Sequence, residues 1–323
     1  MVLEADVIVD RRRLRRKLTL WRLLAVIAVG CAVLAAAAWL VGGRDGLFAH
    51  RSAHIARISV NGLITDDRRR LKLIERLKKT DSVKAVILSI NSPGGTTAGG
   101  EALYNALRDL AEAKPLVSEI GTLGASAGYM IALASDHIVA RRNSLTGSIG
   151  VIVQFGEVSQ LLDKLGIKMD AVKSAPLKAE PSPYAPTSEG ARKVLQDVVD
   201  DTFKWFVGLV EKRRKFAPET ASKLADGRIF TGAQAKSLKL IDAVGGEREA
   251  IKWLTDTHKI DANLPIVEWK VRRQSGGFGI FGSIARAALE TLGLAEGEIL
   301  PTIVESAKLD GLLSVWHASS YNK

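Results

Sequence analysis

The sequence predicts an α/β fold with a parallel-rich β-sheet and covering helices, preceded by one N-terminal transmembrane helix. Apolar runs that suit strands occur at residues 55–64, 83–90 and 116–120, and helical patterns separate them. Alternation of strands and helices is typical of a parallel sheet whose faces are covered by the helices. Ahead of these elements, residues 23–41 form an apolar run without a charge.

The apolar run 23–41 has the length of a membrane span. Its 19 residues would cover about 30 Å as a helix, which matches the hydrocarbon core of a bilayer. Seven basic residues precede it within residues 1–22, so the positive-inside rule places the N-terminus in the cytoplasm and the remainder of the chain outside it. A small-residue stretch, Ala35–Ala38, leaves a cleaved signal peptide open as an alternative, with the same outcome for the remainder of the chain.

Composition fits one sizeable globular domain. Of the 323 residues, 47% are hydrophobic and 25% are charged, which is typical of a folded chain. The single cysteine, Cys31, lies in the apolar run and excludes a disulfide framework or a cysteine-based metal site. The net charge of +11 is partly due to the N-terminal cluster, and without a recognisable motif it does not indicate a nucleic-acid partner.

The pattern divides the chain into five parts. Residues 1–22 form a basic cytoplasmic tail, 23–41 a transmembrane anchor, 42–54 a spacer, 55–255 the main folded domain and 256–323 an extension to which no role is assigned. Four prolines within residues 176–188 predict an ordered loop or a flap. A long amphipathic helix follows from Ser188 towards Arg214, and its expected buried side holds Leu195, Val198, Thr202, Phe206 and Leu209.

Ser126 is the candidate nucleophile. It lies in G-x-x-G-A-S-A-G, where a strand ends and a helix begins. Small neighbours allow a substrate backbone to approach, and a helix start favours negative charge. An ordinary helix cap would give the same local pattern.

The turn Ser92-Pro93-Gly94-Gly95 is the candidate oxyanion site. Its glycines can direct backbone N–H groups into a cleft as oxyanion donors, although a simple tight turn also fits.

The base is better sought among lysines than among histidines. Only His137 lies near Ser126 in sequence, so a Ser-His-Asp triad is weakly supported. A lysine can act as a base where burial favours its neutral amine. The segment VKSAPLKAEPSP offers Lys173 and Lys178, and each also fits an ordinary surface lysine.

Four motifs in a fixed order resemble one known family. NSPGG, GTLGASAGYMIALASD, TGSIGV and KSAPLKAEPSP follow one another, and LADGRIFTGAQAKSLKLID lies downstream. Together they resemble the signal peptide peptidase A family of Ser–Lys peptidases, in its short, single-unit form, over roughly residues 55–250. The resemblance implies a ClpP/crotonase-like fold on the extracytoplasmic side of the cell membrane. It also implies degradation of cleaved signal peptides without a metal or cofactor.

The resemblance also assigns roles to individual residues. It implies Ser126 as nucleophile, Lys178 as general base, Ser148 as a hydrogen-bond partner of the lysine amine, and Gly94 or Gly95 as the oxyanion turn. Lys173 matches a non-catalytic lysine. Ala127 and Ala175 stand where the family often has glycine, which affects the expected local backbone geometry only.

Partners follow from the same resemblance. Short members assemble into rings or domes in which the serine and the lysine of one site can come from neighbouring subunits. We therefore expect a homo-oligomer, a lipid membrane and released signal peptides as partners. Two other classes stay open: a catalytically silent oligomeric membrane scaffold, and a crotonase-type acyl-CoA enzyme, which the anchor argues against. Membrane proteins or lipoproteins are further candidate substrates.

Overall fold

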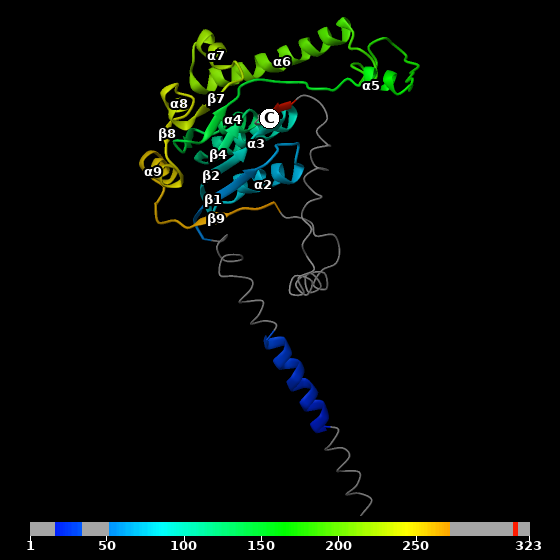
Figure 1. Cartoon of the computed structure of the whole chain (residues 1–323). Coiled ribbons are helices and arrows are strands. Elements are labelled where there is room, and N and C mark those ends of the chain that lie inside the picture. Colours follow the sequence, from blue (N-terminus) through cyan, green and yellow to red (C-terminus); the bar gives the residue numbers. More distant parts are fainter. Residues whose placement is uncertain (1–16, 34–51, 272–312, 316–323) are drawn as a thin grey trace, which may run out of the picture. The chain divides into compact units, whose positions relative to one another are not determined.

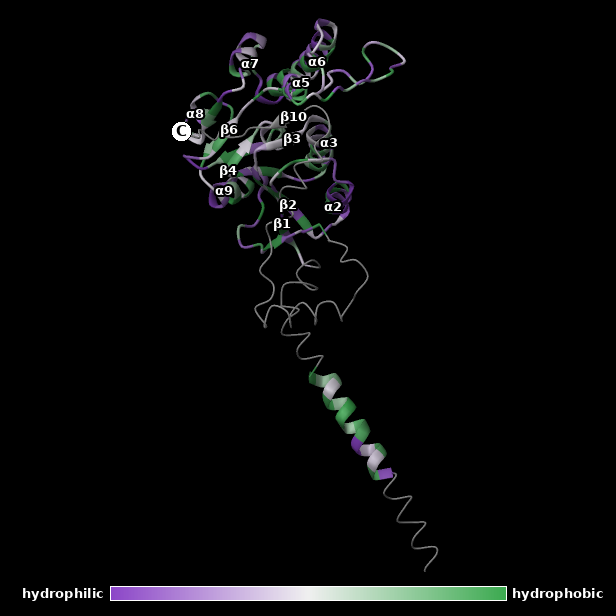
Figure 2. Cartoon of the chain, turned by 45° about the vertical axis from the view of Figure 1, so that its right-hand side comes forward, coloured by the Kyte–Doolittle hydropathy of each residue, from purple (hydrophilic) through white to green (hydrophobic). Residues whose placement is uncertain are grey.

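The computed structural model describes residues 17–33, 52–271 and 313–315. The chain divides into two compact units, Met1–Ser52 and Ala53–Lys323. In the first unit, residues 17–33 form an exposed helix that is mostly hydrophobic (Figure 2). Within the described ranges, no helix has both the length and the apolar character that a membrane span needs. The predicted anchor continues to residue 41, and its part from residue 34 onward lies outside the described residues.

The second unit is built on one mixed sheet (Figure 1). Its strands run in the order β7-β6-β4-β2-β1-β9, and β5 pairs with both β4 and β8. All these pairings are parallel except that of β6 with β7. The strands are β1 (His54–Asn61), β2 (Val83–Ser92), β4 (Leu116–Ala125), β5 (His137–Ala140), β6 (Leu145–Gly147), β7 (Ile229–Thr231), β8 (Ala243–Val244) and β9 (Ile266–Glu268).

Helices alternate with the strands along the chain, as predicted. A short second sheet joins two segments that are distant in sequence. Within the described residues of this unit the helices are α2 (Arg68–Lys79), α3 (Thr97–Ala113), α4 (Ala127–Ala132), α5 (Ser159–Lys164), α6 (Glu189–Arg214), α7 (Pro218–Leu224), α8 (Gly232–Ser237) and α9 (Glu247–His258). The second sheet pairs β3 (Gly94–Thr96) with β10 (Leu313–Val315). This mixed α/β architecture with a mostly parallel sheet agrees with the predicted fold class and fits a ClpP/crotonase-like fold.

Both faces of the sheet are covered. On one face, Ala250 and Leu254 of α9 pack against strand residues that include Ile87. Alternate side chains of a strand point to opposite faces, and Val86 and Leu88 are equally buried, on the face covered by α2, α3 and α4 (Figure 1). Burial on both faces explains why β2 is an almost continuous apolar run rather than an alternating one.

Helix α6 is bonded to the segment after α4 at its C-terminal end. Arg213 donates hydrogen bonds to the carbonyls of Leu133 (2.7 Å) and Ser135 (2.9 Å), just beyond α4. The predicted buried side was wrong at Val198, which is 43% exposed, whereas Phe206 is fully buried as expected. The amphipathic pattern continues along the helix, but most side chains of its first half are exposed, and its large buried side chains, Phe206 and Val210, lie in the second half.

Strand β9 ties the segment after residue 255 to the sheet. It pairs in parallel with β1, and the Trp269 N–H donates to the Arg57 carbonyl at 2.8 Å. The indole N–H of Trp269 donates to Nε2 of the buried His54 at 3.1 Å. The first part of the predicted extension 256–323 therefore adds an edge strand to the main sheet of this unit.

A partly buried ion pair fixes the end of α6 to the segment beside β5. The Arg214 guanidinium donates two hydrogen bonds to the Asp242 carboxylate, at 2.8 and 3.0 Å, and the Ile138 N–H donates a third at 2.8 Å. Burial disfavours the charged carboxylate, but the hydrogen bonds and the charge of Arg214 outweigh it and hold the pKa of Asp242 below its ordinary value.

We predict that Asp242→Asn lowers the free energy of unfolding by about 2 kcal/mol, because it removes the charge that pairs with a largely buried arginine. The stabilisation from Asp242 should be present above about pH 4 and be lost as the pH falls through its lowered folded-state pKa. Urea denaturation at pH 7 and pH 3 measures both effects. Glu75→Gln, which removes an exposed ion pair with Lys79, is the control and should leave the midpoint unchanged. An equal loss at the two pH values would contradict the role of the charge.

Candidate active site

Three neighbouring strands end together at the carboxyl edge of the sheet. Ser92 of β2 lies opposite Gly124 of β4, and Ala125 of β4 lies opposite Gly147 of β6. The residues that follow these strands therefore lie side by side. In parallel α/β sheets this edge is where ligands bind. The register thus brings together Ser126, Ser148 and the Gly94-Gly95 turn.

Ser126 has a strained backbone. Its φ is 57° and its ψ is −119°, a conformation that non-glycine residues rarely adopt and that costs about 1–3 kcal/mol. Its N–H donates to the Gly147 carbonyl (2.8 Å), and its carbonyl accepts from the Met130 N–H (2.8 Å). The residue is 1% exposed. A serine in a sharp turn between a strand and a helix, flanked here by Gly124 and Gly128, is the arrangement of a nucleophile in many hydrolases.

Ser148 follows β6 in a similar way. Its φ is 51°, and its N–H donates to the Arg228 carbonyl at 2.8 Å. The preceding Gly147 has φ 88° and packs so closely on the Phe230 ring that a Cβ would lie 2.7 Å from it. The antiparallel strand β7 thus supports the turn that places Ser148 next to the Ser126 segment.

The Gly94-Gly95 turn continues into the short strand β3. Gly94 has φ 115°, and its N–H donates to the Ser92 hydroxyl oxygen at 3.1 Å. On one edge of β3, the Ile64 N–H donates to the Gly94 carbonyl (2.8 Å), and the Thr96 N–H donates to the Ile64 carbonyl (2.9 Å). A Cβ on Gly95 would overlap the carbonyl oxygen of Ile64. Only glycine at this position lets the two backbones approach.

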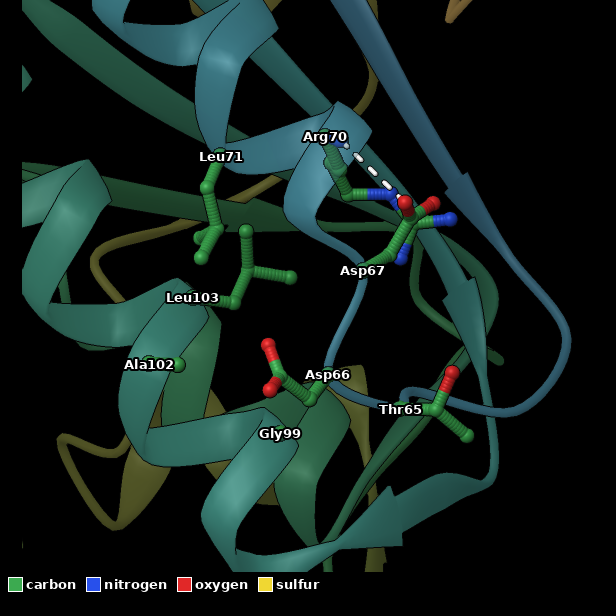
Figure 3. A pocket seen from close by; sticks show the side chains of 8 residues that line it. All are labelled: Thr65, Asp66, Asp67, Arg70, Leu71, Gly99, Ala102 and Leu103. Atoms are coloured by element: carbon green, nitrogen blue, oxygen red, sulfur yellow. Dashed lines mark hydrogen bonds between the residues drawn. The ribbon is translucent and has the colours of Figure 1, made fainter. Parts of the chain in front are cut away.

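The loop behind β3 is held between α2 and α3. The Asp67 carboxylate accepts from the N–H groups of Arg69 and Arg70 at the start of α2. Asp66 points towards the first turns of α3, beside Gly99 (Figure 3). A Cβ on Gly99 would lie 2.5 Å from the Thr65 backbone. This close packing fixes the loop that pairs with Gly94 and Thr96.

Lys178 is not brought to these residues within one chain. It lies in the segment between α5 and α6, where its side chain is exposed, whereas Ser126 is buried. Figure 1 shows this segment beyond the end of α6, far from α4. Lys173 forms an ion pair with Glu180 at 2.5 Å, and its hydrogen bond to that carboxylate lowers the pKa of Glu180. Lys173 therefore has its ion-pair partner within the same loop.

Sequence reasoning did not identify every residue of this site. Ser92, which accepts from the Gly94 N–H, belongs to the same NSPGG motif, and its hydroxyl was the signal that could have indicated it. Ile64, the Arg228 carbonyl and Phe230 come from distant segments and carry no local signal. The described residues hold no group of His, Cys, Asp and Glu side chains suited to a metal ion.

A buried serine in a strained turn, beside a strand with backbone N–H groups, defines the class of serine-type hydrolases. Comparison with known proteins gives the reaction. A family model described as Peptidase family S49 matches residues 108–261, a range that contains Ser126, Ser148 and Lys178. The chain is therefore a serine-type peptidase.

Individual relatives identify the family. A putative protease of Methanocaldococcus jannaschii is 36% identical over 67% of this chain and 69% of its own length. A putative protease of Synechocystis is 35% identical over 75% and 88%. A putative signal peptide peptidase SppA of Enterococcus faecium is 33% identical over 67% of each chain. The chain belongs to peptidase family S49 and is a member of the SppA type.

We predict that Gly95→Ala lowers peptidase activity at least about 100-fold. The added Cβ displaces β3 from Ile64 and with it the backbone donors beside Ser126, and loss of one oxyanion donor costs roughly 10²- to 10³-fold. Hydrolysis of a fluorogenic peptide measures the effect. Gly121→Ala is the matched control, since its Cβ would meet nothing closer than 3.4 Å. Normal activity of Gly95→Ala with an unchanged melting temperature would show that β3 does not need this close contact.

Proposed function

We propose that this chain is a membrane-anchored serine endopeptidase in which Ser126 is the nucleophile and Lys178 the general base. The observation that carries the proposal is the positive φ of the buried Ser126 at the edge where β2, β4 and β6 end. A capping serine needs no such conformation, because N-cap residues have ordinary extended backbone angles. Ser126 also makes no side-chain cap to α4. Strain of this kind is typical of functional sites.

The mechanism needs one proton acceptor and at least one oxyanion donor. The unprotonated amine of Lys178 accepts the Ser126 hydroxyl proton while Oγ attacks the peptide carbonyl. The Gly95 N–H stabilises the negative oxygen, since the Gly94 N–H is already bound to the Ser92 hydroxyl, and the lysine then donates its proton to the leaving amine. Water attacks the resulting ester in the second half of the reaction, with the same lysine as base. Ser148, next to the Ser126 segment, orients the amine by a hydrogen bond.

The exposed position of Lys178 suggests that the base comes from a neighbouring copy. The arm formed by residues 152–198 presents a row of large apolar side chains that the chain itself leaves exposed. They are Ile152, Phe155, Val158, Leu161, Leu165, Ile167, Met169, Val172, Leu177, Tyr184, Val194 and Val198. A patch of this extent is typical of a protein interface. We propose a closed homo-oligomer in which the arm of one subunit brings its Lys178 to Ser126 of the next.

The proposed substrates are extended, apolar peptides, of which cleaved signal peptides are the leading candidates. The uncharged residues 23–41, preceded by the basic tail, support a single membrane anchor with the catalytic domain on the extracytoplasmic side. A peptidase tethered there would meet apolar peptides as they leave the bilayer. The proposed mechanism uses no metal and no cofactor.

We predict that Ser126→Ala and Lys178→Ala each lower kcat at least about 1,000-fold, because members of a nucleophile–base pair act as a unit. Hydrolysis of a fluorogenic apolar peptide by the detergent-solubilised full chain measures this. Lys173→Ala is the control for the base and should retain most of the activity. Loss of activity in Lys173→Ala but not in Lys178→Ala would contradict this assignment and identify Lys173 as the base.

We further predict that mixing the two inactive variants restores activity. If each site combines Ser126 of one subunit with Lys178 of the next, random co-assembly of equal amounts leaves about a quarter of the sites intact. The two variants are mixed after dissociation of the oligomer and reassembled together. A site formed within one chain would give no recovery at any mixing ratio, so the assay separates the two arrangements.

A further inference from the structure

Helix α2 carries a dense positive charge on its outer side. Seven of its twelve residues are basic, and one, Glu75, is acidic. The basic residues, all exposed except the half-buried Arg70, are Arg68, Arg69, Arg70, Lys72, Arg76, Lys78 and Lys79. In Figure 2 this helix is mostly purple and lies at the outside of its unit. A surface of this kind attracts a partner that carries negative charge.

The apolar side of α2 is already used by the core. Leu73, Ile74 and Leu77 are buried, and on the opposite side Arg68 and Lys72, four positions apart, are exposed. The helix therefore offers a partner its charge and little apolar surface. A partner with an extended negative surface fits this better than one that inserts an apolar group.

Acidic groups of the same chain neutralise only part of this charge. Among the described residues, Arg69 pairs with Asp67 at 3.5 Å and Lys79 pairs with Glu75 at 2.6 Å, and both pairs are solvent-exposed. Exposed pairs of this type are weak. The outer side of α2 thus keeps a net positive charge.

The end of α2 lies beside the point where the chain enters this unit. Strands β1 and β2 begin side by side, with His54 opposite Val83. The His54 N–H donates to the Ser82 carbonyl at 2.9 Å, and Ser82 follows α2 after a short turn. From Val41, where the predicted anchor ends, to His54 an extended chain reaches at most about 45 Å. The end of α2 therefore stays within reach of a bilayer that holds the anchor.

We propose that the outer side of α2 is a docking surface for the anionic phospholipid headgroups of the membrane that holds the chain. The inference rests on the proposed function, since it takes residues 23–41 as an anchor. Each Lys or Arg close to an anionic bilayer strengthens binding about fivefold. Several such charges on one rigid helix hold the peptidase unit with this side on the lipid surface.

Amine footprinting of the full chain in lipid nanodiscs tests the docking. The discs contain either phosphatidylcholine alone or an equal mixture of phosphatidylcholine and phosphatidylglycerol. An N-hydroxysuccinimide ester of acetic acid modifies the lysines, and peptide mass spectrometry gives the rate at each position. Lys72 and Lys79 report on α2, and the exposed Lys223 of α7 is the internal reference.

We expect Lys72 and Lys79 to react about tenfold more slowly in the anionic discs, because docking by several charges covers α2 in most molecules. Lys223 should react at the same rate in both kinds of disc. Salt at about 1 M shortens the Debye length to about 3 Å and should abolish the slowing.

Charge variants show whether α2 itself carries the effect. Arg68→Gln combined with Arg69→Gln should remove most of the slowing at Lys72, since each lost charge weakens docking about fivefold. Arg248→Gln combined with Lys252→Gln removes the same charge from exposed positions of α9. It is the matched control and should leave the slowing unchanged.

Two results would overturn the proposal. One is an equal, fast rate at Lys72 in neutral and anionic discs. The other is a slow rate in both, which would show that protein covers α2, such as the acidic Glu101, Asp109 and Glu112 of α3 in a second copy.

Retention in the discs and peptide hydrolysis separate this inference from the proposed function. A chain that leaves the discs refutes the anchor and the docking with it. A chain that stays in the discs and hydrolyses peptide, but shows no slowing at Lys72, refutes the docking alone. A chain that shows the slowing but is inert refutes the peptidase mechanism and keeps the docking surface.

Discussion

The register of β4 between β2 and β6 is the constraint on which the site depends. Hydrogen bonds between parallel strands set Ser92 opposite Gly124 and Gly147 opposite Ala125. Ser126 is the first residue after this paired stretch, so its position follows from ladders on both sides rather than from a mobile loop. A shift of one residue would exchange the side chains on the two faces of the sheet. Such a shift is costly because β2 is closely packed on both faces.

The same edge concentrates unusual backbone conformations. Gly94, Ser126 and Ser148 all have positive φ, and each follows a different strand. For Ser126 the strain is held by bonds at both of its peptide groups, to Gly147 and to Met130. Close packing of glycines on Ile64 and Phe230 leaves these turns no room to relax. A site that must hold a nucleophile and backbone donors in a fixed geometry benefits from this rigidity.

Helix α6 links this rigid edge to the exposed arm. At its C-terminal end, Arg213 is bonded to the carbonyls beyond α4, and Arg214 is paired with Asp242. Its N-terminal end carries the segment with Lys178, together with apolar side chains that the core does not cover. One helix thus connects the proposed nucleophile of its own chain to the segment that carries the proposed base. If Lys178 is the base, a single chain holds an incomplete site, and this separation supports the proposal that assembly completes it.

Local patterns were enough to predict much of this molecule. The apolar run of β2, the strand-to-helix junction at Ser126 and the start of α6 after Ser188 all depend on neighbouring residues, and the structure has them as predicted. The motif order also indicated Ser148 and the two glycines as parts of one site. These features could be predicted because they depend on local signals. The hydrophobic period, the turn residues and the helix caps each involve residues only a few positions apart in the chain.

Other features were decided only by the tertiary structure. The positive φ of Ser126, the support of β3 by Ile64, the exposure of Val198 and the pairing of β10 with the Gly94-Gly95 turn depend on contacts between segments far apart in sequence. Sequence alone determined which residues could perform the chemistry. Strand register and long-range packing decided which of them meet within one chain, because only the folded backbone sets the distances between them.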